Sequence, residues 1–151
     1  NEEPGWIPEP VLLGTFLGEE VVHVCRATGA TTPVDRIATD LVTLQLPTKS
    51  ASITSADSEP WTKPFVVSVA RLGDVAFVGL GGEVLTEIGM AIKAGSPCRH
   101  TFVITHCNGA AGYLVPKELH VQEGYEVRTS RFAPQAADIV IRESIRLLHD
   151  L

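Results

Sequence analysis

The sequence lacks the features that mark membrane-spanning and nucleic-acid-binding proteins. No apolar run approaches the roughly 20 residues that cross a bilayer, because Gly14 and Thr15 interrupt the run at residues 11–17. Basic residues are in deficit: 12 Lys and Arg against 18 Asp and Glu give a net charge of -6, which repels a phosphate backbone. We therefore expect no transmembrane segment and no nucleic-acid partner.

Cysteine is scarce and shows no paired spacing. The chain has three cysteines, Cys25, Cys98 and Cys107, none of them in a CxxC motif. An odd number cannot close a complete disulfide framework, which favours a reducing, cytoplasmic compartment. Each thiol is therefore interpreted first as a small apolar side chain.

What is present is an alternation of helical and strand patterns. The 151 residues are 44% hydrophobic, which suffices for one compact domain with one core. Apolar residues at helical spacing predict an amphipathic helix from residue 11 that ends near Gly29. Alternation predicts a strand at residues 42–46, and the polar stretch at residues 48–60 predicts a loop.

Residues 64–104 carry the strongest structural pattern, followed by a final helix. In chain order we expect strands at residues 64–72 and 75–80, a helix at 84–93, a buried strand at 102–104 and a helix from Pro134. Gly73 and Asp74 suit the tight turn of a hairpin. The strand, helix and strand that follow predict a parallel crossover. The predicted fold class is α/β, with a mixed sheet and flanking helices.

Glu83 stands where the second hairpin strand gives way to the helix. A carboxylate at the end of a sheet can face a pocket, and it is a ligand type for metal ions. The alternative is an acidic residue in the first helical turn, stabilised there by the helix dipole. Glu87, one turn later, is assigned to that second role.

A second group of polar residues follows the strand predicted at residues 102–104. His106 and Cys107 admit a zinc or a nucleophile interpretation, against the alternative of a partly buried histidine. Tyr113 and Tyr125 are the chain's two tyrosines. A phenol can ligate a metal or donate a hydrogen bond to an oxyanion, and a hydrogen-bonded loop tyrosine is the alternative.

Taken in order, these residues resemble the neutral ceramidases and their bacterial relatives. The matching motifs are the strand and Gly-Glu at residues 73–83, Cys107-Asn108 with Tyr113, and Tyr125-Glu126. The similarity covers residues 64–151. Val84 departs from it, because the family's Gly-Glu is usually followed by Phe or Pro.

The resemblance implies roles for three residues. The family's zinc is held by two histidines, a glutamate and a tyrosine, and the last two match Glu83 and Tyr113. Tyr125 matches a tyrosine that contacts the substrate carbonyl. The family's two histidines, a serine and an arginine belong to upstream motifs that are absent here. None of the five histidines of this chain stands at a family ligand position.

The resemblance also implies a function for the protein to which the chain belongs. Residues 1–151 would be the C-terminal portion of a catalytic domain whose upstream half is missing, and that half is its expected partner. The reaction would be zinc-dependent hydrolysis of an N-acyl amide, with ceramide or a ceramide-like lipid as substrate. We expect the isolated chain to be inactive and not to retain zinc. The alternative is a non-catalytic domain for binding or assembly. Members of the family are often secreted, in contrast to the compartment that the cysteines favour.

Overall fold

The computed structural model describes residues 7–34, 36–49 and 61–151. The chain divides into two compact units, Asn1–Pro33 and Val34–Leu151. The expected single core lies in the second unit, since every residue of the buried apolar cluster comes from it. Most of the loop expected at residues 48–60 lies outside the described residues.

The first unit is built on one helix, α1 (Glu9–Ala27). It begins directly after Pro8 and ends at Ala27, close to the predicted end. The N–H of Thr28 donates to the Val24 carbonyl at 2.9 Å and closes the last turn. None of the helix residues is buried, and no helix in the described part of the chain is long and apolar enough to cross a membrane.

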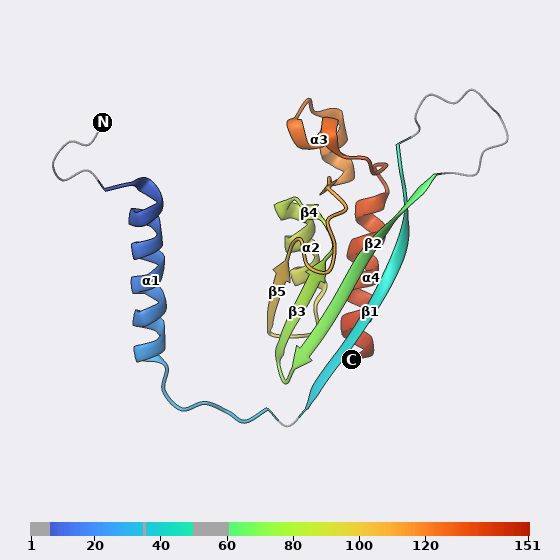
Figure 1. Cartoon of the computed structure of the whole chain (residues 1–151). Helices are drawn as coiled ribbons and strands as arrows, with labels where there is room; N and C mark the ends of the chain where they lie inside the picture. Colours follow the sequence, from blue (N-terminus) through green and yellow to red (C-terminus); the bar gives the residue numbers. More distant parts are fainter. Residues whose placement is uncertain (1–6, 35, 50–60) are drawn as a thin grey trace, which may run out of the picture. The chain divides into compact units, whose positions relative to one another are not determined.

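The second unit is built on a four-stranded sheet (Figure 1). Its strands are β1 (Ile37–Pro47), β2 (Thr62–Leu72), β3 (Val75–Leu80) and β5 (His100–Ile104), in the spatial order β1-β2-β3-β5. The pairs β1–β2 and β2–β3 are antiparallel and β3–β5 is parallel. The predicted hairpin forms, with Gly73 at φ 59° in its turn, where a residue without Cβ is favoured. The sheet is therefore mixed, as predicted.

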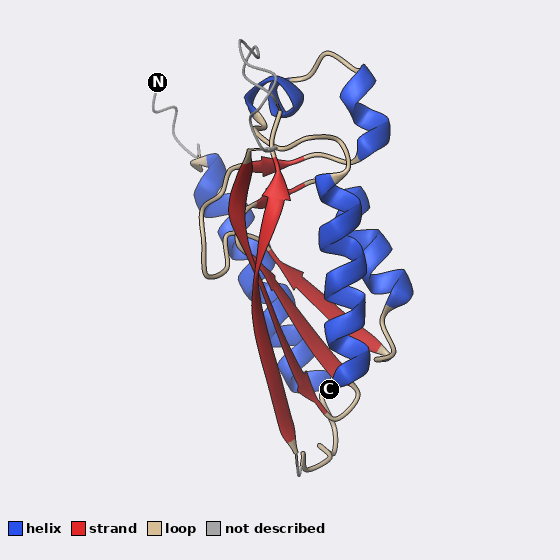
Figure 2. Ribbon diagram, turned by 90° about the vertical axis from the view of Figure 1, so that its right-hand side faces the viewer, coloured by secondary structure: helices blue, strands red, loops and turns tan. Residues whose placement is uncertain are grey.

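Two helices cover one face of this sheet, α2 (Thr86–Gly95) and α4 (Ala136–Asp150), as Figure 2 shows. Alternate residues of the strands point toward them, because side chains along a strand alternate between faces. The fully buried members of this core include Val67, Val78, Leu80, Ile88, Ile92, Val140 and Leu148. The α/β fold class with a mixed sheet and flanking helices is confirmed.

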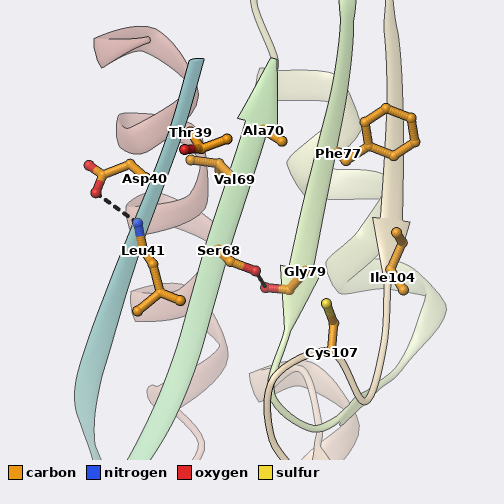
Figure 3. Close-up of a pocket in the computed structure, with 10 residues that line it drawn as sticks. All are labelled: Thr39, Asp40, Leu41, Ser68, Val69, Ala70, Phe77, Gly79, Ile104 and Cys107. Atoms are coloured by element: carbon orange, nitrogen blue, oxygen red, sulfur yellow. Dashed lines mark hydrogen bonds between the residues drawn. The ribbon is translucent and has the colours of Figure 1, made fainter. Parts of the chain in front are cut away.

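The opposite face of the sheet, here called the open face, carries exposed apolar side chains. Leu41 is 55% exposed, Phe102 53% and Ile104 45%. The strand predicted at residues 102–104 forms as part of β5, but the prediction that it is buried is wrong: β5 is an edge strand, and Phe102 and Ile104 lie on the open face. A shallow depression of about 640 Å³ lies on this face between Leu41, Phe77, Ile104 and Cys107 (Figure 3).

Both later helices begin two residues after their expected starts. The helix predicted from Val84 begins at Thr86, because Glu83–Val84 forms the short strand β4. The helix predicted from Pro134 begins at Ala136. The irregular stretch before it contains β6 (Tyr113–Leu114), the 3-10 helix η1 (Lys117–Val121) and the five-residue helix α3 (Tyr125–Thr129).

Candidate functional site

Glu83 and Tyr113 are brought together by the small parallel sheet of β4 and β6. The two residues are register partners in this two-stranded sheet. The N–H of Glu83 donates to the Gly112 carbonyl at 3.0 Å and fixes the pairing. The dipole interpretation of Glu83 is thus wrong, because it lies in a strand, whereas Glu87 does occupy the first turn of α2.

The pKa of Tyr113 is raised in part because Glu83 lies close to it. Partial burial of the phenol raises the pKa of Tyr113 above 10.0, and the charge and hydrogen bonding of the Glu83 carboxylate raise it further. A carboxylate opposes formation of a second negative charge beside it. The Glu83 carboxylate therefore favours the protonated form of the Tyr113 phenol.

His106 lies against the same carboxylate. Its Nε2 is 3.4 Å from Glu83 Oε2, and the two side chains are 53% and 46% exposed. The N–H groups of His106 and Cys107 donate to the Gly82 carbonyl at 3.0 Å and the Leu80 carbonyl at 2.9 Å. These bonds hold the turn after β5 beside the end of β3, which places the imidazole next to Glu83.

Tyr125 completes the group from the N-terminal end of α3. Its ring meets the Tyr113 ring edge-on, with centroids 6.0 Å apart and an interplanar angle of 84°. Ser130, just after α3, donates from Oγ to the Tyr113 carbonyl at 2.8 Å and ties the two segments together. Glu83, His106, Tyr113 and Tyr125 are called the strand-end cluster below.

The strand-end cluster brings together all three residues that the family resemblance singles out. It also contains His106, whose place beside Glu83 the sequence reasoning missed. A signal for it exists in the sequence, since β3 and β5 are the two strands of the predicted parallel crossover. The carboxyl ends of such strands meet at one edge of a sheet, so residues that follow them are neighbours.

Cys107 lies outside the strand-end cluster. Its side chain packs on the backbone of β3, where a Cβ on Gly79 would lie 2.6 Å from the Cys107 Sγ. It lines the depression on the open face together with Ser68 and Gly79 (Figure 3). The next residue, Asn108, donates from Nδ2 to Ser68 Oγ at 3.1 Å. This packing agrees with the interpretation of Cys107 as a small apolar side chain.

The strand-end cluster has the donor types that zinc binds. Carboxylate oxygen and imidazole nitrogen are ligands of the kind found at zinc centres, and the phenol oxygen of Tyr113 is a ligand type that the family resemblance implies. Within residues 7–34, 36–49 and 61–151, no group of three or more His, Cys, Asp or Glu side chains is placed to hold a metal ion. A zinc shell that includes Glu83 and Tyr113 therefore requires further donors.

Two of the solved structures that match share the arrangement of part of this chain. The neutral ceramidase from Pseudomonas aeruginosa superposes with a TM-score of 0.52 at 18% identity, over 61% of this chain. A ceramidase complexed with C2 superposes with a TM-score of 0.53 at 20% identity, over 65% of this chain. The chain has a ceramidase-like fold.

The ceramidase-like similarity is one of fold. The matched region spans 16% of each ceramidase chain, so most of each of those proteins has no counterpart here. No family model and no curated protein sequence matches this chain. At these identities the comparison describes the shape of the backbone, and the roles of Glu83, Tyr113 and Tyr125 remain predictions.

Proposed function

We propose that this chain is the C-terminal portion of a zinc-dependent hydrolase that cleaves the amide bond of ceramide or a ceramide-like lipid. The observation that carries the proposal is the strand-end cluster. Three residues chosen from sequence motifs, from positions 83 to 125, come together around the two-stranded sheet of β4 and β6.

Each residue has a role that its chemistry allows. Glu83 contributes a negative charge that offsets the charge of the metal, and Tyr113 contributes a phenol oxygen beside it. Tyr125 donates a hydrogen bond from its hydroxyl group to the oxygen of the scissile carbonyl as negative charge develops there. Zinc, when bound, polarises the carbonyl and lowers the pKa of a water ligand to about 7.

The remainder of the protein is proposed to supply the groups that are absent here. Two histidines, a serine and an arginine would come from the upstream half, so the isolated chain would not hydrolyse amides. The open face supports an upstream partner, because Leu41 on β1 and Phe102 and Ile104 on β5 leave apolar side chains exposed on it. Exposed apolar patches of this kind mark interaction surfaces.

A second candidate is a domain for binding or assembly without chemistry of its own. Its support is the same open face, together with the small number of metal donors among the described residues. The two candidates differ in what the complete protein does. An assembly domain would leave hydrolysis of N-acyl amides unaffected when the strand-end cluster is changed.

The proposed function is tested by two substitutions in the complete protein. Glu83→Ala should lose zinc and activity together, because it removes a metal ligand. Tyr125→Phe should keep its zinc and lower kcat by roughly 100-fold or more, the usual effect of deleting one oxyanion donor. Zinc by elemental analysis and kcat on a short-chain ceramide are the measurements.

Glu87→Ala is the matched control, since Glu87 is also an acid near the start of α2 and lies outside the strand-end cluster. It should change neither zinc content nor kcat. Release of zinc by Tyr125→Phe with retention by Glu83→Ala would reverse the two roles. Full activity in both variants would favour the assembly domain.

A further inference from the structure

Strand β5 (His100–Ile104) forms one edge of the four-stranded sheet and pairs there with β3 (Figure 1). The N–H of His100 donates to the carbonyl of Asp74, the residue that precedes β3. Successive residues of a strand direct their N–H and C=O groups to opposite sides, so those of Thr101 and Val103 point away from β3. Within the described part of the chain, no second strand lies beside them. This edge therefore offers a row of free donors and acceptors.

The edge lacks the features that usually prevent a strand from pairing with another chain. Charged residues, prolines and bulges commonly protect such edges, but β5 contains no Asp, Glu, Lys, Arg or Pro. The opposite edge strand, β1, carries Asp40. On β5, Phe102 and Ile104 also leave about half of their area exposed. An added strand would therefore meet an uncharged, partly apolar edge at β5.

The sequence of β5 is complementary to itself in one antiparallel register. A two-fold axis at Phe102 places Thr101 of each copy opposite Val103 of the other. Residues whose N–H and C=O groups point outward form the hydrogen-bonded pairs of an antiparallel ladder, and each such pair exchanges two N–H···O bonds. The two Phe102 side chains would then form the closer, non-hydrogen-bonded pair, an arrangement in which aromatic pairs stabilise a sheet.

The helix side of the sheet also leaves space beside β5. A depression of about 220 Å³ lies between α2 and this strand, with Val84, Gly89, Met90 and Val103 in its lining. Met90 is 59% exposed. In the antiparallel register, the second copy brings its own Thr101 and Val103 to this side. Apolar groups would therefore meet on both faces of the joined sheet.

We propose that the chain forms a symmetric dimer through β5, in which two four-stranded sheets join into one continuous sheet. The occupant of the edge is a second copy because the same strand supplies both sides of the register, as a two-fold interface requires. Interfaces that bury less than about 1,200 Å² are weak, and a five-residue strand is short. The dimer should therefore dissociate on dilution. The inference goes beyond the proposed function and does not depend on it.

Sedimentation velocity of the full chain over a concentration series is the first test. We expect monomer at low concentration and dimer at high concentration. Phe102→Lys should leave monomer throughout, because it sets two like charges opposite each other at the axis. Leu41→Lys is the matched control: Leu41 is similarly exposed on the same face but lies in β1. It should dimerise as the unchanged chain does.

A second variant acts on the backbone instead of the side chain. Thr101→Pro removes one outward N–H group, and proline is tolerated on an edge strand when its nitrogen faces away from the sheet. It should therefore keep the pairing with β3 and lose the dimer. Circular dichroism shows whether each variant is folded, and Thr101→Pro decides the matter if Phe102→Lys is not.

Cross-linking tests the register. Residues of a non-hydrogen-bonded antiparallel pair have Cα atoms about 4.5 Å apart, within reach of a disulfide. Phe102→Cys should therefore cross-link to its copy when oxidised glutathione accepts the two electrons. Ile104→Cys is the control, since its two copies would lie about 13 Å apart along the strands, beyond the limit of about 7 Å. The exposed Cys25 is replaced by serine in both variants.

Several results would overturn the inference. A chain that stays monomeric at every concentration has no self-complementary edge, and β5 is then open to a strand of a different protein. A dimer that Leu41→Lys also abolishes, or that survives both Phe102→Lys and Thr101→Pro, is held by another surface. Cross-linking of Ile104→Cys in place of Phe102→Cys would reject the axis at Phe102. None of these measurements involves amide hydrolysis, so the proposed function is tested separately.

Discussion

The two faces of the four-stranded sheet are made from the same strands but have opposite surroundings. Val67 and Val78 point toward α2 and α4 and are 0% exposed, whereas Leu41 and Phe102 on the open face are 55% and 53% exposed. Burial of apolar area is the main favourable term in folding. The covered face therefore stabilises the fold, and the open face and the strand-end cluster are left free for other contacts.

The strongest test of this comparison uses one substitution on both faces. Phe65 is 1% exposed on the covered face and packs edge-on against Phe132, with ring centroids 5.8 Å apart. Phe65→Ala should lower the free energy of unfolding by about 3–5 kcal/mol, because it leaves a cavity in the core. Denaturant unfolding of the chain measures it.

Phe102→Ala is the same change on the open face. Phe102 is half exposed and stacks on Phe77, with ring centroids 5.2 Å apart. Its loss should cost about 1 kcal/mol, the value of an aromatic pair with little buried area. Equal costs at the two positions would show that the open face is buried in solution, and the comparison would break.

A smaller effect sharpens the description of the covered face. Ser144 is 0% exposed in α4, and its Oγ has no hydrogen-bond partner among the residues that the structure describes. Ser144→Ala should raise the free energy of unfolding by about 1 kcal/mol, because it removes a desolvated, unsatisfied hydroxyl. The midpoint of thermal unfolding is the measurement.

Ser130 is the matched control for Ser144. It is also buried, at 4% exposure, but its Oγ donates to the Tyr113 carbonyl and accepts from the N–H of Phe132. Ser130→Ala should lower the free energy of unfolding by about 1–2 kcal/mol, since it leaves those groups without a partner. A loss of stability in both variants would mean that the Ser144 hydroxyl is satisfied.

The smallest expected effect concerns the strand-end cluster and is a shift in the pKa of Tyr113 rather than a change in stability. Burial and the Glu83 carboxylate both raise the pKa of Tyr113 above 10.0. Glu83→Gln removes the negative charge that opposes ionisation, so the midpoint of tyrosinate formation should move down toward 10.0. Ultraviolet absorption against pH measures this midpoint. Tyr125→Phe is introduced both in the unchanged chain and in the Glu83→Gln variant, so that Tyr113 is the one tyrosine that titrates. An unchanged midpoint would place the two side chains further apart in solution.

The sequence predicts the scaffold well because the signals for it are local. The Gly73-Asp74 turn between two β-rich runs is sufficient for the hairpin, and the order of strand, helix and strand is sufficient for the parallel pairing of β3 with β5. The exposure of Phe102 was mispredicted for a complementary reason. An apolar run does not reveal whether its strand is central or at an edge, because that depends on how many strands the sheet contains.

The candidate site was predictable in part. Motif resemblance singled out Glu83, Tyr113 and Tyr125, and the structure brings them together. The contact of His106 with Glu83 depends on a left-handed turn and on two long-range backbone hydrogen bonds. Neither leaves a periodic pattern in the sequence. A two-residue strand such as β4 is likewise too short to be distinguished from the start of a helix.

The pairing of β4 with β6 has a consequence for the order in which the molecule folds. It joins Glu83 to Tyr113, thirty positions along the chain, through a ladder of two residues, whereas the β2–β3 hairpin closes over Gly73 and Asp74 alone. Closing a long loop costs more entropy than closing a short one, and two paired residues return little of it. The hairpin and its crossover should therefore form first, and Glu83 should meet Tyr113 only on a finished sheet. A metal ion that binds there would then meet a protein that is already folded, and it would not be needed to start folding.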